Sequence, residues 1–280
     1  FKDRIGGSVS WYRNMTTDFL ISEPIASQTG FSSYVNNFKG IVQNTGWEFE
    51  LRTLNIMNPN FQWKTNFNFT IAKNSLYKYD DLEGSAYAEK YEIGQPLDIV
   101  RMYYVDSISK VNGYAKFRDV NGDGKLTYPA DYVTIGSPTP RNYGGMENVF
   151  TYKNFELGFT ITCAQQMVTN WYFNTSLPGR ARNTPDLLLG NYWQKTGDDA
   201  TYPRPTTGLV NNMDVRNLSY TNLSNMAYND ILWFRLNNVS LRYSLPEAWV
   251  QKAGMSNVSV YARGQNLIFY SPVDLGKDPQ

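Results

Sequence analysis

Residues 61–71, which read Phe-Gln-Trp-Lys-Thr-Asn-Phe-Asn-Phe-Thr-Ile, alternate between apolar or threonine side chains and polar ones. Because successive side chains of a strand point to opposite faces, this period of two predicts a β-strand with one apolar and one polar face. Strands of soluble sheets usually have about 5 to 6 residues, whereas a tilted strand that crosses a membrane needs about 9 to 11. The segment therefore favours a transmembrane β-barrel whose polar face lines a wet lumen.

The same alternation recurs along the chain and predicts an all-β, antiparallel fold. Turn residues at 57–60 and at Lys153-Asn154 join neighbouring strands into hairpins. A change of phase at Asn237-Asn238 predicts a β-bulge. We expect about eight to ten strands, a number that can close a small barrel, although the long connections argue against a self-contained one. Besides 61–71, the expected strands are residues 5–14, 47–52, 99–105, 146–152, 155–163, 232–245 and 258–262, with others at 19–21 or 34–41.

The composition agrees with a barrel and argues against other classes. Aromatic residues make up 15% of the chain and charged residues 18%, against about 25% charged in ordinary soluble domains. Barrels place aromatic residues in girdles at the two membrane interfaces. The mean hydropathy of −0.48 and the lack of an apolar run of about 18 residues exclude a helical membrane span. With a net charge of +1 and no basic cluster, we expect no nucleic-acid partner.

Candidate catalytic chemistry is sparse. The chain has no histidine, so a His-based triad or zinc site cannot form within it. The single cysteine, Cys163, lies on the apolar side of its predicted strand, where a small apolar role is expected. A Gly-x-Ser-x-Gly pattern does not occur. We therefore expect no enzymatic activity.

Three segments between the strands are too long for hairpin turns, namely residues 74–96, 106–143 and 164–229. Barrels of the outer membrane have long extracellular loops and short periplasmic turns, so residues 164–229 are expected to form a long extracellular loop region. Its aromatic side chains offer flat faces that stack on sugar rings or, alternatively, pack the loop into a folded cap. The candidates for contact with cargo are Trp171, Tyr172, Tyr192 and Trp193. Residues 246–254 are expected to form a short helix at a periplasmic turn.

The sharpest local motif is Asp-Val-Asn-Gly-Asp-Gly-Lys at residues 119–125. Oxygen ligands at its first, third and fifth positions and glycine at its sixth match the start of an EF-hand-type loop. Its twelfth position is Ala130, and a carboxylate comes one residue late. A plain turn is the alternative, since Asn-Gly and Asp-Gly are turn signals. We predict a structural calcium, or magnesium, bound by Asp119, Asn121, Asp123, the backbone carbonyl of Lys125, and Asp131.

A collinear series of short motifs resembles the SusC/RagA family of TonB-dependent outer-membrane transporters of Bacteroidetes. The motifs include residues 44–51, 61–63, 119–124, 136–140, 152–155, 200–204, 233–241 and 264–267. The resemblance implies that residues 1–280 are the C-terminal portion of a 22-stranded barrel. It places the plug, the TonB box and the final strand outside this chain. It also supports a metal at the Asp119 loop.

The resemblance further implies TonB-dependent import of oligosaccharides across the outer membrane of a Gram-negative, Bacteroidetes-type bacterium. A SusD-like surface lipoprotein is the expected partner, in a dimer of transporter–lipoprotein pairs, and TonB would act on the absent N-terminal region. The alternative cargo is an oligopeptide. From another class, a secreted β-sandwich that binds carbohydrate remains an alternative, as does a self-contained barrel or simple porin. The strand at 61–71 discriminates among these, because its apolar face should meet lipid in a barrel and a second sheet in a sandwich.

Overall fold

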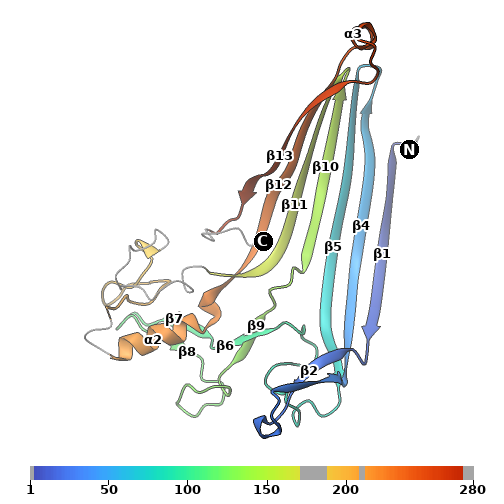
Figure 1. Cartoon of the computed structure of the whole chain (residues 1–280). Helices are drawn as coiled ribbons and strands as arrows, with labels where there is room; N and C mark the ends of the chain where they lie inside the picture. Colours follow the sequence, from blue (N-terminus) through green and yellow to red (C-terminus); the bar gives the residue numbers. More distant parts are fainter. Residues whose placement is uncertain (1–2, 171–187, 208–211, 274–280) are drawn as a thin grey trace.

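A computed structural model gives the fold of residues 3–170, 188–207 and 212–273. The main feature is a seven-stranded antiparallel sheet, here called the wall, in the order β1-β4-β5-β10-β11-β12-β13 (Figure 1). Its strands are β1 (Ile5–Thr16), β4 (Gly40–Met57), β5 (Phe61–Tyr79), β10 (Asn142–Tyr152), β11 (Phe155–Thr169), β12 (Tyr228–Ser244) and β13 (Ser259–Tyr270). Several of them are far longer than strands of ordinary sheets, with 19 residues in β5.

The remaining elements gather at the ends of the wall (Figure 1). At the turn end lies α3 (Glu247–Lys252), the short helix expected between residues 246 and 254. Three two-stranded sheets and α2 (Asn212–Asn222) gather at the opposite end, here called the loop end. The three sheets are β2 (Leu20–Pro24) with β3 (Ser33–Asn37), β6 (Val100–Met102) with β9 (Val133–Gly136), and β7 (Val105–Ile108) with β8 (Ala115–Phe117). Two 3-10 helices, η1 (Ser27–Thr29) and η3 (Asn225–Ala227), complete the described elements.

The strand prediction was correct in kind, but it overcounted the strands of the wall. Segments 19–21, 34–41 and 99–105 do contain strands, yet these pair in the small sheets, so the described wall has seven strands instead of eight to ten. At the first two segments, the apolar side chains turn inward. Phe19, Ile21 and Phe38 join a core with Leu76 and Tyr79 at the loop end, and burial there competes with pairing along the wall.

The hairpin turns are confirmed, with the geometry that the turn residues favour. The Asn58 side-chain carbonyl accepts hydrogen bonds from the backbone N–H groups of Asn60 (3.1 Å) and Phe61 (2.8 Å), which closes the β4–β5 turn. Lys153 has a φ of 51° between β10 and β11, where Tyr152 faces Phe155. Both turns lie at the same end of the wall as α3.

The predicted bulge is also confirmed, and it lies in the middle of β12. The pairing of β12 with β11 skips from Leu236 to Asn238, so Asn237 is the extra residue against β11. On the other side of β12, two residues of β13, Asn266 and Leu267, lie opposite Asn237. The side-chain amide of Asn237 donates to the hydroxyl of Thr162 at 3.0 Å. The extra residue restores the register, so that Leu236 and Val239 lie on the same face despite the odd spacing between them.

The register brings the apolar positions of all seven strands onto one face of the wall. Phe69, for example, lies between Phe49 of β4 and Gly144 of β10. Phe61 and Ile71 mark the ends of this apolar band on β5. At about 3.3 Å per residue and a strand tilt of about 40° from the barrel axis, the segment between them spans about 25 Å along that axis. This matches the height of the outward apolar band in outer-membrane barrels, about 25 Å.

The apolar band is exposed in this chain. Val9, Trp11 and Val260 remain 63%, 56% and 63% exposed, and in the described part of the chain no second sheet covers this face. An apolar surface of this size is unfavourable in water and needs a lipid or protein neighbour. The β-sandwich alternative required a second sheet here and does not agree with the fold. No helix among the described residues is long and apolar enough to cross a membrane.

Candidate functional site

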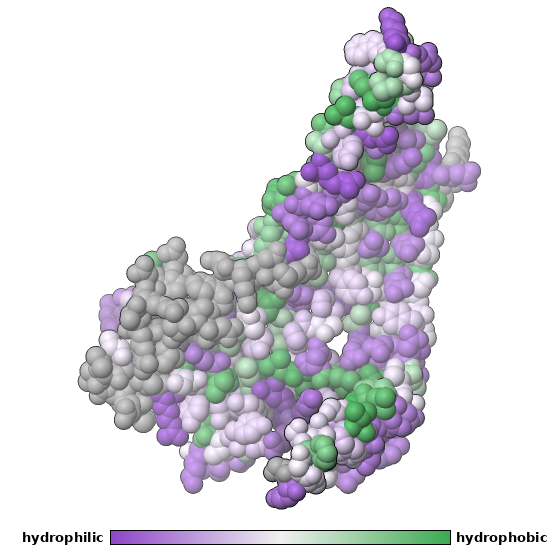
Figure 2. Space-filling view, viewed as in Figure 1, coloured by the Kyte–Doolittle hydropathy of each residue, from purple (hydrophilic) through white to green (hydrophobic). Residues whose placement is uncertain are grey.

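Over the height of the apolar band, the polar face of the wall carries the charged side chains of the strands, such as Glu50, Lys64 and Arg235. Its rows run across the strands, as in Glu50, Asn68, Gly145, Thr162 and Arg235. Hydrophilic and pale residues predominate over the wall in the view of Figure 2. Carboxylates and guanidinium groups both occur on this face, so it is wettable without a strong charge of one sign.

Near the turn end, the apolar face carries a group of stacked aromatic rings packed around the buried side-chain amide of Asn148. Asn148 is 4% exposed, and its side-chain oxygen accepts from the Trp63 indole at 2.9 Å and from the Thr65 hydroxyl at 2.7 Å. The rings of Trp63 and Phe150 stack at 5.3 Å, and Phe150 stacks on Phe159 at 6.0 Å. The Trp63 indole and the Thr65 hydroxyl are thus paired with the Asn148 side chain on this face.

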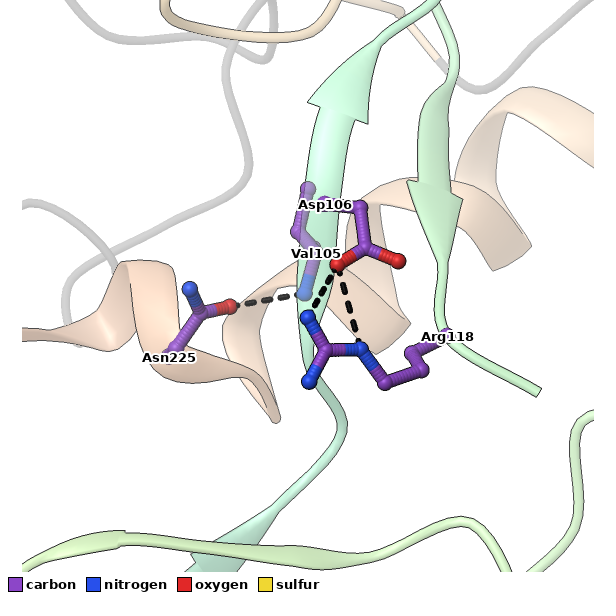
Figure 3. A network of polar contacts seen from close by, with 4 residues as sticks. All are labelled: Val105, Asp106, Arg118 and Asn225. Carbon is purple, nitrogen blue, oxygen red and sulfur yellow. Dashed lines mark hydrogen bonds and ion pairs between the residues drawn. The ribbon is translucent and has the colours of Figure 1, made fainter. Parts of the chain in front are cut away.

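The sheets β6–β9 and β7–β8 form a folded unit with α2 at the loop end, here called the cap. Asn217 of α2 pairs with the backbone of Ala115 in β8, accepting from its N–H at 2.9 Å and donating to its carbonyl at 3.0 Å. In the same way Asn225 accepts from the N–H of Val105 at 2.8 Å (Figure 3). These amides replace missing strand neighbours, so segments more than 100 residues apart form one body.

An ion pair holds the outer edge of β7 and β8 together. Arg118 donates to a carboxylate oxygen of Asp106 from Nη2 at 2.5 Å and from Nε at 3.1 Å (Figure 3). These hydrogen bonds raise the pKa of Arg118 above its usual value. The guanidinium also lies 4.2 Å from the ring centre of Tyr104.

The loop at residues 119–125 has the conformation that its glycines and carboxylates predict. The two Asp119 oxygens accept from the N–H groups of Gly122 and Gly124, each at 2.7 Å. Asn121 and Asp123 lie beside each other, with the Asn121 amide donating to Asp123 at 3.1 Å. Gly122 and Gly124 have φ values of 73° and 77°, a region that glycine adopts without strain. The loop therefore gathers the first three proposed ligands.

Asp131 supports this loop from inside. It is fully buried, and its oxygens accept from the N–H of Val120 at 2.9 Å and from the N–H of Thr127 at 2.7 Å. These hydrogen bonds lower the pKa of Asp131. Both oxygens are thus engaged with the backbone, and among the described residues no three His, Cys, Asp or Glu side chains lie close enough to share an ion. Any cation here would rely on amide and carbonyl oxygens in addition to two carboxylates.

Of the four loop aromatics, two lie in the described residues and both pack within the cap. Trp193 donates its indole N–H to the carbonyl of Lys110 at 3.2 Å, and its ring lies against Gly113, where an added Cβ would approach within 2.5 Å. Tyr192 packs with Leu188 and Ala227. These contacts agree with the alternative that the aromatic side chains pack the loop into a folded cap. Trp171 and Tyr172 lie outside the described residues.

A cavity of about 640 Å³ lies where the cap joins the polar side of the wall. Its lining comes from distant segments, among them Tyr12 of β1, Asn44 of β4, Gln95 and Arg141. Nothing in the spacing of these residues signals a common site, so sequence reasoning missed them. Asp98 holds the junction together, since it accepts from the hydroxyls of Ser137 at 2.7 Å and Thr139 at 2.6 Å.

The pKa of Asp98 gives this junction a defined response to acid. Partial desolvation raises the pKa of Asp98, but the hydrogen bonds from Thr139 and Ser137 outweigh it, and the net pKa is lowered. A depressed folded-state pKa contributes stability above the unfolded value, near 3.9, and this contribution is lost as the pH falls through the folded value. We expect Asp98→Asn to lower the thermal unfolding midpoint at pH 7, with the difference from wild type shrinking in acid as the pH falls through the lowered folded-state pKa of Asp98. A difference that persists unchanged at pH 3 would contradict this role.

The comparisons with known proteins agree with the wall geometry. TonB-dependent receptor P3 of Formosa agariphila is 30% identical over 100% of this chain, and SusC of Bacteroides thetaiotaomicron is 24% identical over 99%. The solved RagAB peptide importer in its open-open state superposes with a TM-score of 0.72 at 22% identity over 96% of the chain. No protein-family model matches. The chain belongs with the SusC/RagA-like TonB-dependent transporters.

This SusC/RagA-like chain spans 29% of the length of receptor P3 and 28% of SusC, and its match covers 30% of the RagAB chain. It is thus a stretch of transmembrane β-barrel wall that is open at both edges, with β1 and β13 as the outer strands. In such a wall the apolar band faces lipid and the polar face lines the lumen. The cavity at the cap junction consequently lies on the lumen side, because Tyr12 and Asn44 belong to the polar face.

Proposed function

We propose that the protein of which this chain is part imports oligosaccharides across a bacterial outer membrane by TonB-dependent transport. The observation that carries the proposal is the wall itself, which combines a lipid-sized apolar band with a polar lumen face and superposes on the RagAB importer. A passive lumen cannot concentrate a nutrient, so energy coupling through TonB supplies the driving force. The named relatives are receptors and transporters, and we propose no enzymatic activity.

The likeness to SusC and to the RagAB importer also supports a proposal about partners. We propose a SusD-like lipoprotein over the mouth of the barrel, TonB acting on a region outside residues 1–280, and a dimer of transporter–lipoprotein pairs. The cap would be the part of this chain that meets the lipoprotein, since it is the folded unit at the loop end. The second candidate cargo is an oligopeptide, favoured by the likeness to a structure described as a peptide importer.

Uptake by cells tests the proposed function. We expect cells that carry the full-length protein to accumulate oligosaccharide from the medium, and deletion of either its gene or the tonB function to abolish accumulation. Uptake that persists without TonB would contradict active import and favour a porin. Accumulation of peptides in place of sugars would favour the second candidate.

We also propose that the loop at residues 119–125 binds calcium, or magnesium, as a structural ion. Asp119, Asn121, Asp123, the backbone carbonyl of Lys125 and Asp131 would be its ligands. The oxygens of Asp119 and Asp131 already accept backbone N–H groups, so these two carboxylates would coordinate through their remaining lone pairs. The support is the gathering of three oxygen-bearing side chains on a glycine turn. The ion would stiffen the cap and take no part in any reaction.

Removal of the proposed ion by a chelator should make the loop at residues 119–125 easier to cleave. We expect a chelator to increase proteolysis between residues 117 and 133 of the full-length protein, and added Ca²⁺ to reverse the effect. Asp123→Ala should cause the same loss and be insensitive to Ca²⁺. Asp80→Ala is the matched control, because Asp80 is an exposed loop carboxylate that pairs with Lys78. Equal proteolysis with and without chelator would leave the plain turn as the better account.

A further inference from the structure

The cavity at the cap junction has the dimensions of a ligand site. Its volume of about 640 Å³ falls within the range of about 300 to 1,000 Å³ that is usual for small-molecule sites. The wall contributes Tyr12, Asn44 and Asn74 to it, and the connections to the cap contribute Gln95, Pro96 and Ser137. A molecule bound here would touch the lumen wall and the cap together.

One phenol and five amides make up most of the uncharged polar lining, namely Tyr12, Asn44, Asn74, Gln95, Asn142 and Gln165, and the last two bind each other at 2.8 Å. Gly46 leaves room for the ring of Tyr12, since a Cβ at this glycine would lie 2.5 Å from the Tyr12 hydroxyl. That hydroxyl and the side chain of Gln95 make no hydrogen bond within the described chain. Asn44 accepts from Asn74 at 2.7 Å through its oxygen, which leaves its own N–H groups for a ligand. Amide and phenol groups both donate and accept, so they pair with neutral hydroxyl groups.

The charged groups of the cavity are already engaged. Arg141 pairs with Asp230, and Asp98 accepts from Ser137 and Thr139. Lys73 also borders the cavity, but its place in β5 puts its side chain on the same face as Ile71 and opposite to Asn74, because neighbouring side chains of a strand alternate. No single charged group therefore stands ready to receive the terminus of a peptide or an anionic sugar.

The backbone around the cavity is engaged as well. The N–H of Ala72 donates to Arg141 and that of Gly94 donates to Leu76, each at 2.8 Å. Recognition of a peptide by strand addition needs a free strand edge, which the described lining does not offer. The side chains that remain are suited to hydroxyl groups, and this favours a sugar over a peptide.

We propose that this cavity binds an uncharged segment of oligosaccharide, with hydrogen bonds from Tyr12, Asn44 and Gln95. The proposal rests on the proposed import function and names the substrate class and the residues that would hold it. A sugar in this position would lie against the Ser137–Thr139 connection that leads from β9 of the cap into β10 of the wall.

The test uses the purified full-length transporter in detergent. Binding of neutral linear glucan, xylan and mannan oligosaccharides would be measured by calorimetry, in parallel with peptides from a casein digest. We expect the double variant Tyr12→Phe with Asn44→Ala to bind its preferred sugar about tenfold or more weakly, because several hydrogen bonds are lost. The matched control, Tyr261→Phe with Asn68→Ala, makes the same chemical changes on the same face at residues that do not line the cavity and should bind as wild type.

The outcomes separate this proposal from the proposed function. If cells import the sugar in a TonB-dependent way but the cavity double variant binds it as well as the control, the cavity assignment is wrong while import stands. If the transporter binds casein peptides and none of the sugars, the substrate class is wrong. If cells import neither cargo, the proposed function fails. Gln95→Ala, on a connection outside the wall strands, repeats the test should the double variant fold poorly.

Discussion

Arginine in place of Phe67 is expected to destabilise the membrane-inserted protein by about 2 to 4 kcal/mol, the range measured for charged residues at the midplane of outer-membrane barrels. Phe67 lies in the middle of the apolar band, between Leu51 and Met146 on the neighbouring strands, and is 36% exposed in this chain. The substitution would therefore place a charged guanidinium in the hydrocarbon layer, where the apolar ring of Phe67 contacts lipid. The measurement is the free energy of unfolding of the full-length protein in phosphatidylcholine vesicles.

The adjacent residue provides the control for Phe67→Arg. Asn68 points to the opposite face, beside Gly145 and Glu50, so Asn68→Arg places the same charge in the lumen. We expect its free energy of unfolding to change by less than about 0.5 kcal/mol, as is usual at exposed positions. Equal effects from the two variants would contradict the assignment of the faces.

The second large effect is expected at Gly144, where the apolar band is tightly packed. A Cβ at Gly144 would clash with the backbone oxygen of Asn68 and lie 2.9 Å from the ring of Phe69. Because a backbone atom of the adjacent strand cannot move freely, Gly144→Ala should cost about 1 to 3 kcal/mol, the usual range for overpacking. A urea titration of the full-length protein in phosphatidylcholine vesicles would measure this loss of unfolding free energy.

Gly145 is the matched control for this clash. Its added Cβ would meet its nearest neighbour at 3.4 Å, an ordinary contact, so Gly145→Ala should be neutral or slightly stabilising, since alanine restricts the unfolded chain. A Gly144→Ala variant as stable as Gly145→Ala would show that β5 and β10 separate more easily than the register implies.

Much of the wall was predictable because its constraint is local. Lipid on one side and water on the other impose a period of two on every residue of a strand, and this period was readable at residues 61–71, 146–152 and 155–163. The bulge at Asn237 was readable for the same reason, since an extra residue shifts the period. The hairpin turns were predictable from their turn residues, Asn58 and Lys153-Asn154.

The ends of the strands were less predictable. β5 continues to Tyr79 and β11 to Thr169, well into segments expected to be loops. Beyond the apolar band, both faces meet water or the cap, so the strands keep their backbone pairing without any need to alternate. Backbone hydrogen bonds require no particular side chains, so they cannot be predicted from the sequence. Contact with lipid requires apolar side chains at alternate positions, so it can be predicted.

The cap and its cavity depended on tertiary structure. Asn217 and Asn225 act as substitutes for strand neighbours more than 100 residues away, and nothing in their local sequence distinguishes them from other loop asparagines. The cavity likewise draws Tyr12, Asn44 and Gln95 together from separate segments. The sequence by itself determined which face of each strand meets lipid, because that choice is made one residue at a time. Only the tertiary structure decided which polar side chains share a site, because their meeting depends on how the connections return to the wall.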